Sequence, residues 1–550
     1  MRAVRIVMLS VAAGCLTAFL SAPAVPQVSL PACKERASAP LDASGPQWNG
    51  WSPNANNTRF EDAAAAGLSA GSVKKLKLKW AFNLGEVGVA RAQPVIIGGR
   101  LFTTAQNGSV YALDAATGCM RWRFQADIGV RSGVTFGDAN GTPAVFFGDL
   151  RAAIYALDAD NGRLIWKVKP VEHPASMVTA TPRFYDGVIY QPISSFEEAL
   201  AAKPDYRCCT FRGSVVALDA GTGRTIWQAF TIAETPAPSR KGPTGVQQYG
   251  PSGAAVWSSP TIDAQGGAVY VATGDNYSDP PTNTSDAVLA MDLKTGRVLW
   301  SRQLTGGDTY NNSCSTPRRA NCPSTTGPDA DFGQPPILLG LAGGKRELVV
   351  AQKTGIAYAL DPDRRGEVLW RTRAGEGGPF GGSQWGSASD GRNMYVAISG
   401  QKVHAIRDPQ SPRGFRFVVD PREGGGLVAL DVTTGRVVWN APPPTPPACA
   451  PTGTNCSPAQ SAAVTAIPGV VFSGSVDGHL RAYATQNGEV IWDMNSAQEY
   501  EAANGGTARG GSMDAAGPAV VNGMLFVNSG YGQWGGMPGN VLLAFSVNGE

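Results

Sequence analysis

Residues 213–227 read GSVVALDAGTGRTIW, and variants of this phrase recur along the chain. Each copy joins a β-rich run, an Asp, a turn built on Thr-Gly or Asn-Gly, and a second β-rich run carrying a Trp, which is typical of a β-hairpin. Six further copies end at Trp122, Trp166, Trp300, Trp370, Trp439 and Trp492. An eighth copy is split, because GNVLLAF at 539–545 and LKLKWAF with Trp80 lie at opposite ends of the chain. A repeat divided in this way predicts a closed ring.

The spacing of these phrases predicts the fold class. Successive Trp residues lie 42 to 73 residues apart, and further strand-like runs lie between the phrases. Four short strands per unit at this period are typical of β-propeller blades, and closure removes exposed edge strands. We therefore predict an all-β fold, an eight-bladed β-propeller whose last blade is closed by the N-terminal strand. Unrelated hairpins in a two-domain β protein are the alternative that this regularity disfavours.

The N-terminus indicates an exported protein. Residues 1–24, MRAVRIVMLSVAAGCLTAFLSAPA, contain two Arg residues, an apolar run and small residues near the end, which is the pattern of a cleaved signal peptide. A lipoprotein site at Cys15 is disfavoured because the apolar run continues past it. We divide the chain into a signal peptide (1–24), an N-terminal extension (25–46) and the propeller (47–550), and we predict a periplasmic location.

The charge balance gives little indication of macromolecular partners. The formal net charge is +3 with 16% charged residues, and no Lys/Arg run follows the signal region. Neither nucleic acid nor an anionic membrane surface is therefore expected as a partner. No segment after the signal region has the length of apolar sequence that a membrane span requires.

Without Cys15, eight cysteines remain, an even number that fits disulfides in an oxidising compartment. By loop length and elimination we expect three pairs, although the sequence alone does not prove them: Cys314 with Cys322, Cys449 with Cys456, and Cys33 with Cys119. The remaining Cys208 and Cys209 are adjacent. A disulfide between them would close a strained eight-membered ring of a kind that persists at functional sites, and two unbridged neighbours are the alternative.

From WNGWSPNANNTRF to GYGQWGGMPGNVLLAF the mature chain resembles the quinoprotein alcohol dehydrogenases, and DYRCCTFRGSVVALD resembles the polyvinyl alcohol dehydrogenase branch of that family. The Ala-x-Asp-x-x-Thr-Gly-x-x-x-Trp phrase is similar to the family's tryptophan-docking motif. The resemblance implies pyrroloquinoline quinone (PQQ) and calcium in the central funnel. Outer-membrane assembly lipoproteins share this propeller and bind no cofactor, so the function has to be argued from the site.

The resemblance implies a cation held by oxygen ligands, because calcium is a hard ion. Glu197 and Glu198, in ISSFEEAL, lie where the family has its carboxylate ligand, and Glu198 fits the spacing slightly better. Asp275 and Asn276, in VATGDNYSD, lie where the family has an Asn ligand, and the choice between them stays open. Solvated acidic loops are the alternative for both segments.

The resemblance also implies two catalytic residues. Asp308, in LTGGDTYNN after Trp300, matches the family's catalytic Asp and would take the hydroxyl proton. Lys353, in AQKTGIAYALD, would lie beside the quinone oxygens, where an ammonium stabilises negative charge. A Gly-Gly-Asp-Thr turn would explain Asp308 without chemistry.

PQQ is a flat tricarboxylate, so its site should combine aromatic surface with cationic and hydroxyl groups. Trp257, in GAAVWSSPTID, matches the family's stacking Trp and lies outside the docking phrase. Further cofactor contacts implied by the resemblance are Arg131, Thr179, Gln384, Trp385 and Lys353, with Cys208 and Cys209 on the opposite face of PQQ from Trp257. The adjacent cysteines follow the calcium-carboxylate segment here, whereas methanol-oxidising members carry them one blade earlier.

The chain contains no Cys-x-x-Cys-His motif, so we expect no covalent haem and a separate soluble cytochrome c as electron acceptor. We interpret the chain as a periplasmic PQQ- and calcium-dependent dehydrogenase that oxidises secondary hydroxyl groups to ketones, with polyvinyl alcohol as a candidate substrate. The alternatives are a cofactor-free propeller scaffold or assembly protein, and a quinoprotein acting on other alcohols or sugars. We expect the segments 231–256, 309–330 and 440–460 to form walls at the funnel mouth.

Overall fold

The Trp phrases form the two outer strands of antiparallel four-stranded sheets. The computed structural model describes residues 33, 40–411, 414–444, 448–450 and 452–550. The described residues form one folded unit, and the expected signal peptide lies outside them. Eight blade sheets are present, seven with four strands and one with five, which confirms the eight-bladed β-propeller.

Seven blades follow the chain order, and their strands are listed here by blade. The first two contain β2 (Val95–Ile97), β3 (Arg100–Thr104), β4 (Ser109–Asp114) and β5 (Met120–Gln125), then β6 (Thr135–Ala139), β7 (Thr142–Gly148), β8 (Ile154–Asp158) and β9 (Leu164–Val168). The next two contain β10 (Ser176–Met177), β11 (Arg183–Tyr185), β12 (Val188–Ser195), β13 (Ser214–Asp219) and β14 (Thr225–Phe230), then β18 (Thr261–Asp263), β19 (Ala268–Ala272), β21 (Ala287–Asp292) and β22 (Val298–Gln303). Two more contain β23 (Ile337–Gly340), β24 (Arg346–Ala351), β25 (Ile356–Asp361) and β26 (Glu367–Arg373), then β27 (Ala388–Ser389), β28 (Asn393–Ala397), β31 (Leu427–Asp431) and β32 (Val437–Ala441). The seventh contains β33 (Thr465–Ile467), β34 (Val470–Gly474), β35 (His479–Ala484) and β36 (Val490–Asn495).

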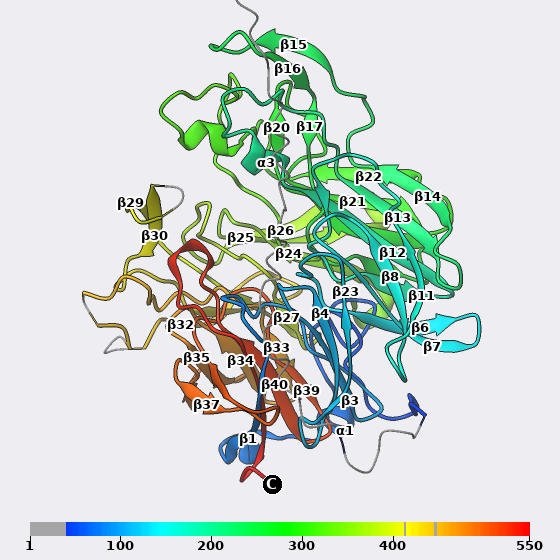
Figure 1. Ribbon diagram of the computed structural model, residues 1–550, viewed down its shortest axis with the longest axis vertical. Helices are drawn as coiled ribbons and strands as arrows, with labels where there is room; N and C mark the ends of the chain where they lie inside the picture. The colour runs from blue at the N-terminus through cyan, green and yellow to red at the C-terminus, as the bar shows by residue number, and fades with distance from the viewer. Residues whose placement is uncertain (1–32, 34–39, 412–413, 445–447, 451) are drawn as a thin grey trace, which may run out of the picture. The chain divides into compact units, whose positions relative to one another are not determined.

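The eighth blade combines strands from both ends of the chain. Its strands β39 (Ala519–Val521), β40 (Met524–Ser529) and β41 (Val541–Val547) are followed in the sheet by β1 (Leu76–Asn83). Leu76 lies opposite Val547 and Asn83 opposite Val541, and Figure 1 shows β1 in blue beside the red C-terminal strands. The N-terminal strand β1, with Trp80, therefore occupies the outer position that the Trp-bearing strand occupies in the other blades.

The docking Trp side chains join each blade to the next. The Trp166 indole N–H donates to the Ala220 carbonyl oxygen at 2.9 Å, and the ring covers Gly223. A Cβ at Gly223 would lie 2.8 Å from the Trp166 ring, and the φ of this glycine is 72°. Indole-to-carbonyl hydrogen bonds are also made by Trp80, Trp122, Trp227, Trp370, Trp439 and Trp492. The turn needs Gly both for its left-handed backbone and for the approach of the neighbouring ring.

The apolar core is divided among the interfaces between neighbouring blades. One cluster joins Val215 and Trp227 of one blade to Val269 and Leu289 of the next, and all four side chains are buried. Both faces of the central strands pack against neighbours, which explains continuous apolar runs in place of alternation. The ring is therefore a repeated set of mainly apolar interfaces.

Short elements and hairpins lie outside the blade sheets. The helices are α1 (Ala63–Ala66), α2 (Ala70–Val73), α3 (Glu197–Leu200), η1 (Asn312–Ser315), η2 (Ala342–Gly344), η3 (Pro362–Arg364) and η4 (Gln533–Gly535). Two-stranded sheets pair β15 (Ala237–Lys241) with β16 (Gln247–Gly250), β17 (Ser252–Gly253) with β20 (Asn276–Ser278), β29 (Val403–Arg407) with β30 (Phe415–Val419), and β37 (Glu499–Glu501) with β38 (Thr507–Arg509). Figure 1 shows β15–β16 and β29–β30 as projections from the blades. Among the described residues no helix is long and apolar enough to cross a membrane.

Four disulfides are present, and they are the pairs expected from the sequence. They join Cys33 to Cys119, Cys208 to Cys209, Cys314 to Cys322, and Cys449 to Cys456. Two of them close loops within the segments 309–330 and 440–460, which the sequence suggested as walls of the funnel.

Candidate active site

A pocket brings together four of the expected cofactor residues, Arg131, Thr179, Trp257 and Trp385. The Trp257 and Trp385 rings are nearly perpendicular, with centroids 5.3 Å apart, and the Arg131 guanidinium lies 5.0 Å from the Trp385 ring centroid. The pocket is also lined by Trp51, Arg91, Gln93, Ser132, Gly133, Ala180, Thr181, Ser258, Ser259, Gly333 and Ala515. Most of these residues shortly precede the first strand of a blade, which explains why segments far apart in sequence converge here.

The pocket has the chemistry of a site for a flat polyanion. Burial, followed by the nearby charge of Arg91, lowers the pKa of Arg131 to about 9, so Arg131 is a cation at neutral pH. The Ser258 hydroxyl is buried and has no hydrogen-bond partner within the described part of the chain. Indole surface, two guanidinium groups and an unpartnered hydroxyl fit a planar carboxylated ring system.

Lys353 connects this pocket to a group of carboxylates. Its ammonium donates to Asp329 Oδ1 at 2.7 Å and to Asp331 Oδ2 at 2.8 Å, and it lies 5.6 Å from the Trp257 ring centroid. The backbone N–H of Asp275 donates to Asp331 Oδ1 at 2.7 Å. Burial alone would lower the pKa of Lys353, but Asp329 and Asp331 raise it well above its usual range. Lys353 is therefore a permanent cation at the edge of the pocket.

The carboxylates near Lys353 repel one another. Burial raises the pKa of Glu198 to about 8, and the neighbouring charges of Asp329 and Asp331 contribute to the rise. Burial, followed by Asp331 and Glu198, raises the pKa of Asp275 well above its usual range, and Asp275 Oδ2 is buried without a hydrogen-bond partner in the described chain. A bound cation would relieve this repulsion. The described residues contain no group of three or more His, Cys, Asp or Glu side chains already arranged around a metal position.

Glu197 has a structural role that sets it apart from its neighbour Glu198. Its carboxylate is completely buried and accepts the backbone N–H groups of Thr210 at 2.9 Å and Phe211 at 2.7 Å. It also accepts the Tyr206 hydroxyl at 3.0 Å. These bonds hold the segment that follows the adjacent cysteines, so the geometry favours Glu198 as the metal ligand of the pair.

Asn276 is likewise occupied by bonds within the fold. Its side-chain amide donates to the Ser252 carbonyl oxygen at 3.0 Å, and its Oδ1 accepts the Thr282 N–H at 2.7 Å. The amide therefore joins β20 to β17 through its N–H group and stabilises the turn between β20 and β21 through its oxygen. The unpartnered oxygen of Asp275 makes Asp275 the better candidate ligand in this segment.

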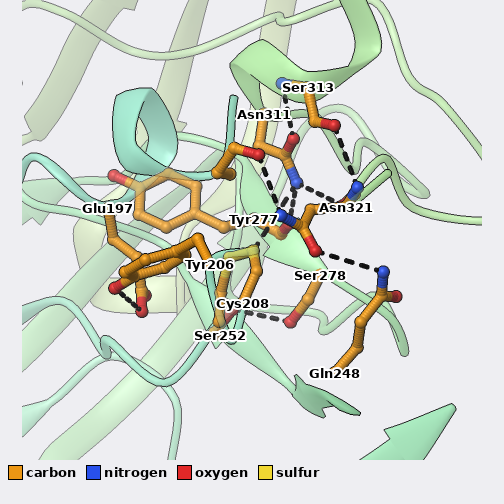
Figure 2. Close-up of a disulfide and its surroundings, with 12 residues drawn as sticks. Glu197, Tyr206, Cys208, Gln248, Ser252, Tyr277, Ser278, Asn311, Ser313 and Asn321 are labelled. Atoms are coloured by element: carbon orange, nitrogen blue, oxygen red, sulfur yellow. Dashed lines mark hydrogen bonds between the residues drawn. A yellow bond between two sulfur atoms is a disulfide. The ribbon is translucent and has the colours of Figure 1, made fainter. Parts of the chain in front are cut away.

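The Cys208–Cys209 disulfide is buried, and Figure 2 shows Cys208 with its surroundings, which include Tyr277 and Asn311. The Asn311 side-chain amide donates to the Tyr277 carbonyl oxygen at 2.8 Å and lies 3.9 Å from Cys208 Sγ. Both cysteines and Tyr277 belong to one apolar cluster, against which Trp257 packs. The disulfide thus lies near Trp257, and its position on the opposite face of PQQ stays a prediction.

Asp308, which the sequence suggested as the base, supports the loop that carries Asp329 and Asp331. Its side chain is completely buried, and its oxygens accept the N–H groups of Asp329 at 3.2 Å and Ala330 at 2.6 Å. Asp331, which the sequence reasoning missed, instead contacts Lys353. These contacts favour a structural role for Asp308, whose assignment as base stays a prediction.

Asp331 lies beside the Trp257 indole. A Cβ at Gly274 would lie 2.5 Å from Asp331 Oδ1 and 3.3 Å from Trp257 Nε1, so the two side chains share this glycine as a neighbour. The signal that could have identified Asp331 is its place two residues before Gly333, a residue that lines the pocket just ahead of β23.

Gln384 and Trp385 also differ in their contacts. The Gln384 side-chain amide donates to the Gly381 carbonyl oxygen, so its contact with a cofactor stays a prediction. The Trp385 indole N–H donates to Asp514, which also accepts the Ser461 hydroxyl at 2.8 Å. Asp514 therefore fixes the ring of Trp385 in the wall of the pocket.

Known proteins share this propeller and much of its sequence. Residues 48–319 match the glucose/ethanol/alcohol dehydrogenase β-propeller domain of the PQQ family, and residues 331–548 match the outer membrane protein assembly factor BamB family. The chain is 43% identical over 536 residues to a polyvinylalcohol dehydrogenase of Pseudomonas sp., covering 94% of this chain and 80% of that protein. It is 40% identical over 537 residues to a polyvinylalcohol dehydrogenase of Sphingopyxis sp., covering 94% and 79%.

A solved structure extends the comparison to the fold. The quinohemoprotein alcohol dehydrogenase from Comamonas testosteroni superposes with a TM-score of 0.66 at 20% sequence identity, covering 92% of this chain and 81% of that chain. At this identity the superposition shows a shared fold, whereas the two polyvinylalcohol dehydrogenases show kinship over nearly the whole chain. This chain therefore belongs to the family of PQQ-dependent alcohol dehydrogenases, with the polyvinylalcohol dehydrogenases among its relatives.

Proposed function

We propose that this dehydrogenase is exported to the periplasm and oxidises secondary hydroxyl groups, including those of polyvinyl alcohol, to ketones with PQQ and calcium. A separate cytochrome c receives the electrons. The observation that carries this proposal is the contact between Lys353 and Asp331, 2.8 Å, beside the pocket that Trp257 and Arg131 line. The names of the two polyvinylalcohol dehydrogenase relatives support the choice of polymer.

The pocket residues would hold the cofactor. Trp257 and Trp385 offer aromatic surface, while Arg131, Thr179 and Ser258 offer partners for carboxylate groups. Glu198 and Asp275 would supply oxygen ligands to calcium, and a cation between them offsets the repulsion that raises the pKa of each. Bound PQQ would supply the acceptor for the hydride that leaves the alcohol carbon.

Asp331 is the proposed base for the hydroxyl proton. The ammonium of Lys353 and the N–H of Asp275 each bond one oxygen of its carboxylate, which fixes its orientation. A carboxylate oxygen can accept more than one hydrogen bond, so Asp331 can still receive the substrate hydroxyl. Asp308 remains the alternative base.

A second pocket would admit the alcohol. It is lined by Pro328, Asp329, Ala330, Lys353, Thr354, Arg373, Gly377 and Gly378. Because Lys353 lines this pocket and also contacts Asp331 near Trp257, a hydroxyl group entering here would meet the proposed base. The glycines carry no side chains that would narrow the entrance for a chain-like substrate.

Reconstitution tests the proposed function. Apo-protein supplied with PQQ and calcium should reduce a dye with 2-butanol and with polyvinyl alcohol, and the rate should saturate with each substrate. Absorbance titration should show saturable PQQ binding. Bound PQQ without activity on any alcohol would overturn the substrate assignment, and no saturable binding would favour the scaffold alternative. Faster turnover of sugars or primary alcohols would favour a quinoprotein that acts on those substrates.

A further inference from the structure

Four aromatic side chains form a contiguous cluster that the blade architecture does not require. Trp534 lies 4.9 Å from Phe417 and 5.3 Å from Phe380, measured between ring centroids. Phe415 lies 5.4 Å from Phe417. Phe415 is 36% exposed and the other three are partly buried. We call Phe380, Phe415, Phe417 and Trp534 the aromatic cluster.

The aromatic cluster is continuous with the candidate active site on two sides. Trp534 packs, together with Trp385, against the buried group of Val89, Ala515 and Tyr531. Trp385 and Ala515 line the cofactor pocket. On the other side, Phe380 follows Gly378 by two residues, and Gly378 lines the pocket that contains Lys353. The aromatic cluster therefore lies next to both pockets.

Strand β30 and helix η4, which lie outside the blade sheets, position three of these rings. Phe415 and Phe417 lie on β30 of the hairpin inserted between β28 and β31, which Figure 1 shows projecting from the blades. Strand β30 packs against η4, where a Cβ at Gly535 would lie 3.0 Å from the backbone of Phe417. The hairpin thus brings two aromatic residues onto Trp534 instead of completing a sheet.

The backbone of Trp534 adds an independent observation. Its φ is 56° and its ψ is 26°, in the left-handed region that bulky residues rarely adopt. Such a conformation is unfavourable and persists where the surrounding structure holds the side chain in place, as in ligand clamps. Gly would relieve this backbone, so the position of the indole ring is the feature that a Trp here supplies.

The rings offer apolar surface without an ionised group among them. The nearest charge on the same strand, Arg416, faces Asp408 at 3.8 Å. A neutral ligand with hydrocarbon stretches fits such a surface better than a charged one, because aromatic faces bind CH groups and give up little hydration.

We propose that the aromatic cluster binds the units of a hydroxylated hydrocarbon polymer that flank the reacting hydroxyl group. The CH and CH2 groups of the polymer pack against Phe417, Trp534 and Phe380, and its other hydroxyl groups remain in water. This inference rests on the proposed function and names the part of the protein that distinguishes a polymer from a small alcohol.

The test compares substrates of different length. In Phe417→Ala and in the double variant Phe415→Ala/Phe417→Ala, the ratio of kcat/KM for polyvinyl alcohol to kcat/KM for 2-butanol should fall about tenfold. Leu369→Ala is the matched control, because Leu369 is 44% exposed on the outer strand β26, and its ratio should equal that of the wild type. An unchanged ratio in the Phe variants, or an equal fall in Leu369→Ala, would overturn the proposal.

A binding measurement separates this inference from the proposed function. Calorimetric titration of PQQ-free protein with polyvinyl alcohol oligomers should give a Kd that rises about tenfold in Phe417→Ala. This measurement needs no turnover. An inactive enzyme that still binds the oligomers through Phe417 would therefore contradict the proposed function and leave the inference intact. Equal oligomer affinity in wild type and variant would sink the inference. A variant that slows only cytochrome c-coupled assays, with dye-coupled assays intact, would make the cluster a protein-docking surface and overturn the proposal.

Discussion

Trp227 and Trp257 lie close together in sequence but have opposite surroundings. Trp227 donates its indole N–H to the Leu293 carbonyl oxygen at 3.3 Å and covers Gly296 of the next blade. Trp257 lies 5.6 Å from the Lys353 ammonium and 5.3 Å from the Trp385 ring, and it lines a pocket. The ring of blades is held mainly by apolar contacts that repeat, whereas charged groups from different blades converge at the candidate active site.

Aspartates show the same contrast between ring and site. Asp292, in a docking turn, accepts hydrogen bonds from the Thr295 hydroxyl and N–H, and these lower its pKa. Asp275, in the site, has its pKa raised by burial and by neighbouring carboxylates. The turn Asp is stabilised as an anion by its own local structure. The site Asp needs a partner that the chain does not supply, which is the condition expected of a ligand-binding group.

The largest expected effect separates the two candidate bases. Asp331→Asn should lower kcat by about 10²–10⁴-fold, because the amide cannot take the hydroxyl proton. Asp308→Asn should lower kcat much less and should reduce thermal stability, because it loses an acceptor for the loop N–H groups at Asp329 and Ala330. Dye-coupled kinetics and thermal melts of both variants would check this. The reverse order of kcat losses would restore Asp308 as the base.

The second prediction compares the loss of each tryptophan. Trp227→Ala should cost about 3–5 kcal/mol of stability by opening a cavity between blades, and the folded fraction should still bind PQQ. Trp257→Ala should weaken PQQ binding about tenfold to a hundredfold with a smaller loss of stability, because its ring borders a pocket. Thermal melts and absorbance titrations on both variants give the comparison. Equal loss of quinone affinity in the two variants would contradict the division between ring and site.

The fold could be predicted from the sequence because each blade carries its own turn chemistry and docking residue. Thr-Gly turns followed by Trp are local signals, and a split copy at the two ends signals closure. Trp257 was suggested by its match to the stacking Trp of the family that the chain resembles, and by its place outside the docking phrase. These features depend on neighbours in sequence or on departures from a period, and both are visible in a single chain.

The acidic part of the site could not be predicted in the same detail. Glu197 and Glu198 are adjacent in α3, and successive helical residues point in different directions, so only the structure distinguishes the one that supports a loop. Similarly, Asp308 and Asp331 lie on one connection between blades. Which of them reaches Lys353 depends on how the loop folds back, and in this chain Asp308 binds the loop backbone while Asp331 contacts the ammonium.

The third prediction concerns the docking glycines. Gly223 and Gly187 have φ values of 72° and 75°, but only at Gly223 would a Cβ meet a neighbour, the Trp166 ring at 2.8 Å. Gly187→Ala should cost about 1 kcal/mol for its backbone alone. Gly223→Ala should cost about 2–4 kcal/mol, because the ring has to move as well. Urea denaturation of the two variants measures the difference, and equal costs would show that docking adds nothing to the turn.

The smallest expected effect concerns Glu61, a buried carboxylate outside the candidate active site. Glu61 is 7% exposed, and its Oε2 has no hydrogen-bond partner in the described chain. Burial raises the pKa of Glu61 to about 7 from an ordinary value of 4.5. The folded protein therefore holds this proton more tightly than the unfolded chain, and the free energy of unfolding falls as the pH rises between these two values.

Glu61→Gln removes this titration. At pH 8 the variant should have a higher Tm and a free energy of unfolding higher by about 1–3 kcal/mol. This gain in stability should shrink as the pH falls toward 4.5. The exposed Glu86 provides the matched control, since Glu86→Gln removes the same charge from the surface. A benefit equal at both pH values would mean that the introduced amide acts by packing. A benefit confined to high pH would show that the unpartnered carboxylate of Glu61 weakens the folded protein when it is ionised.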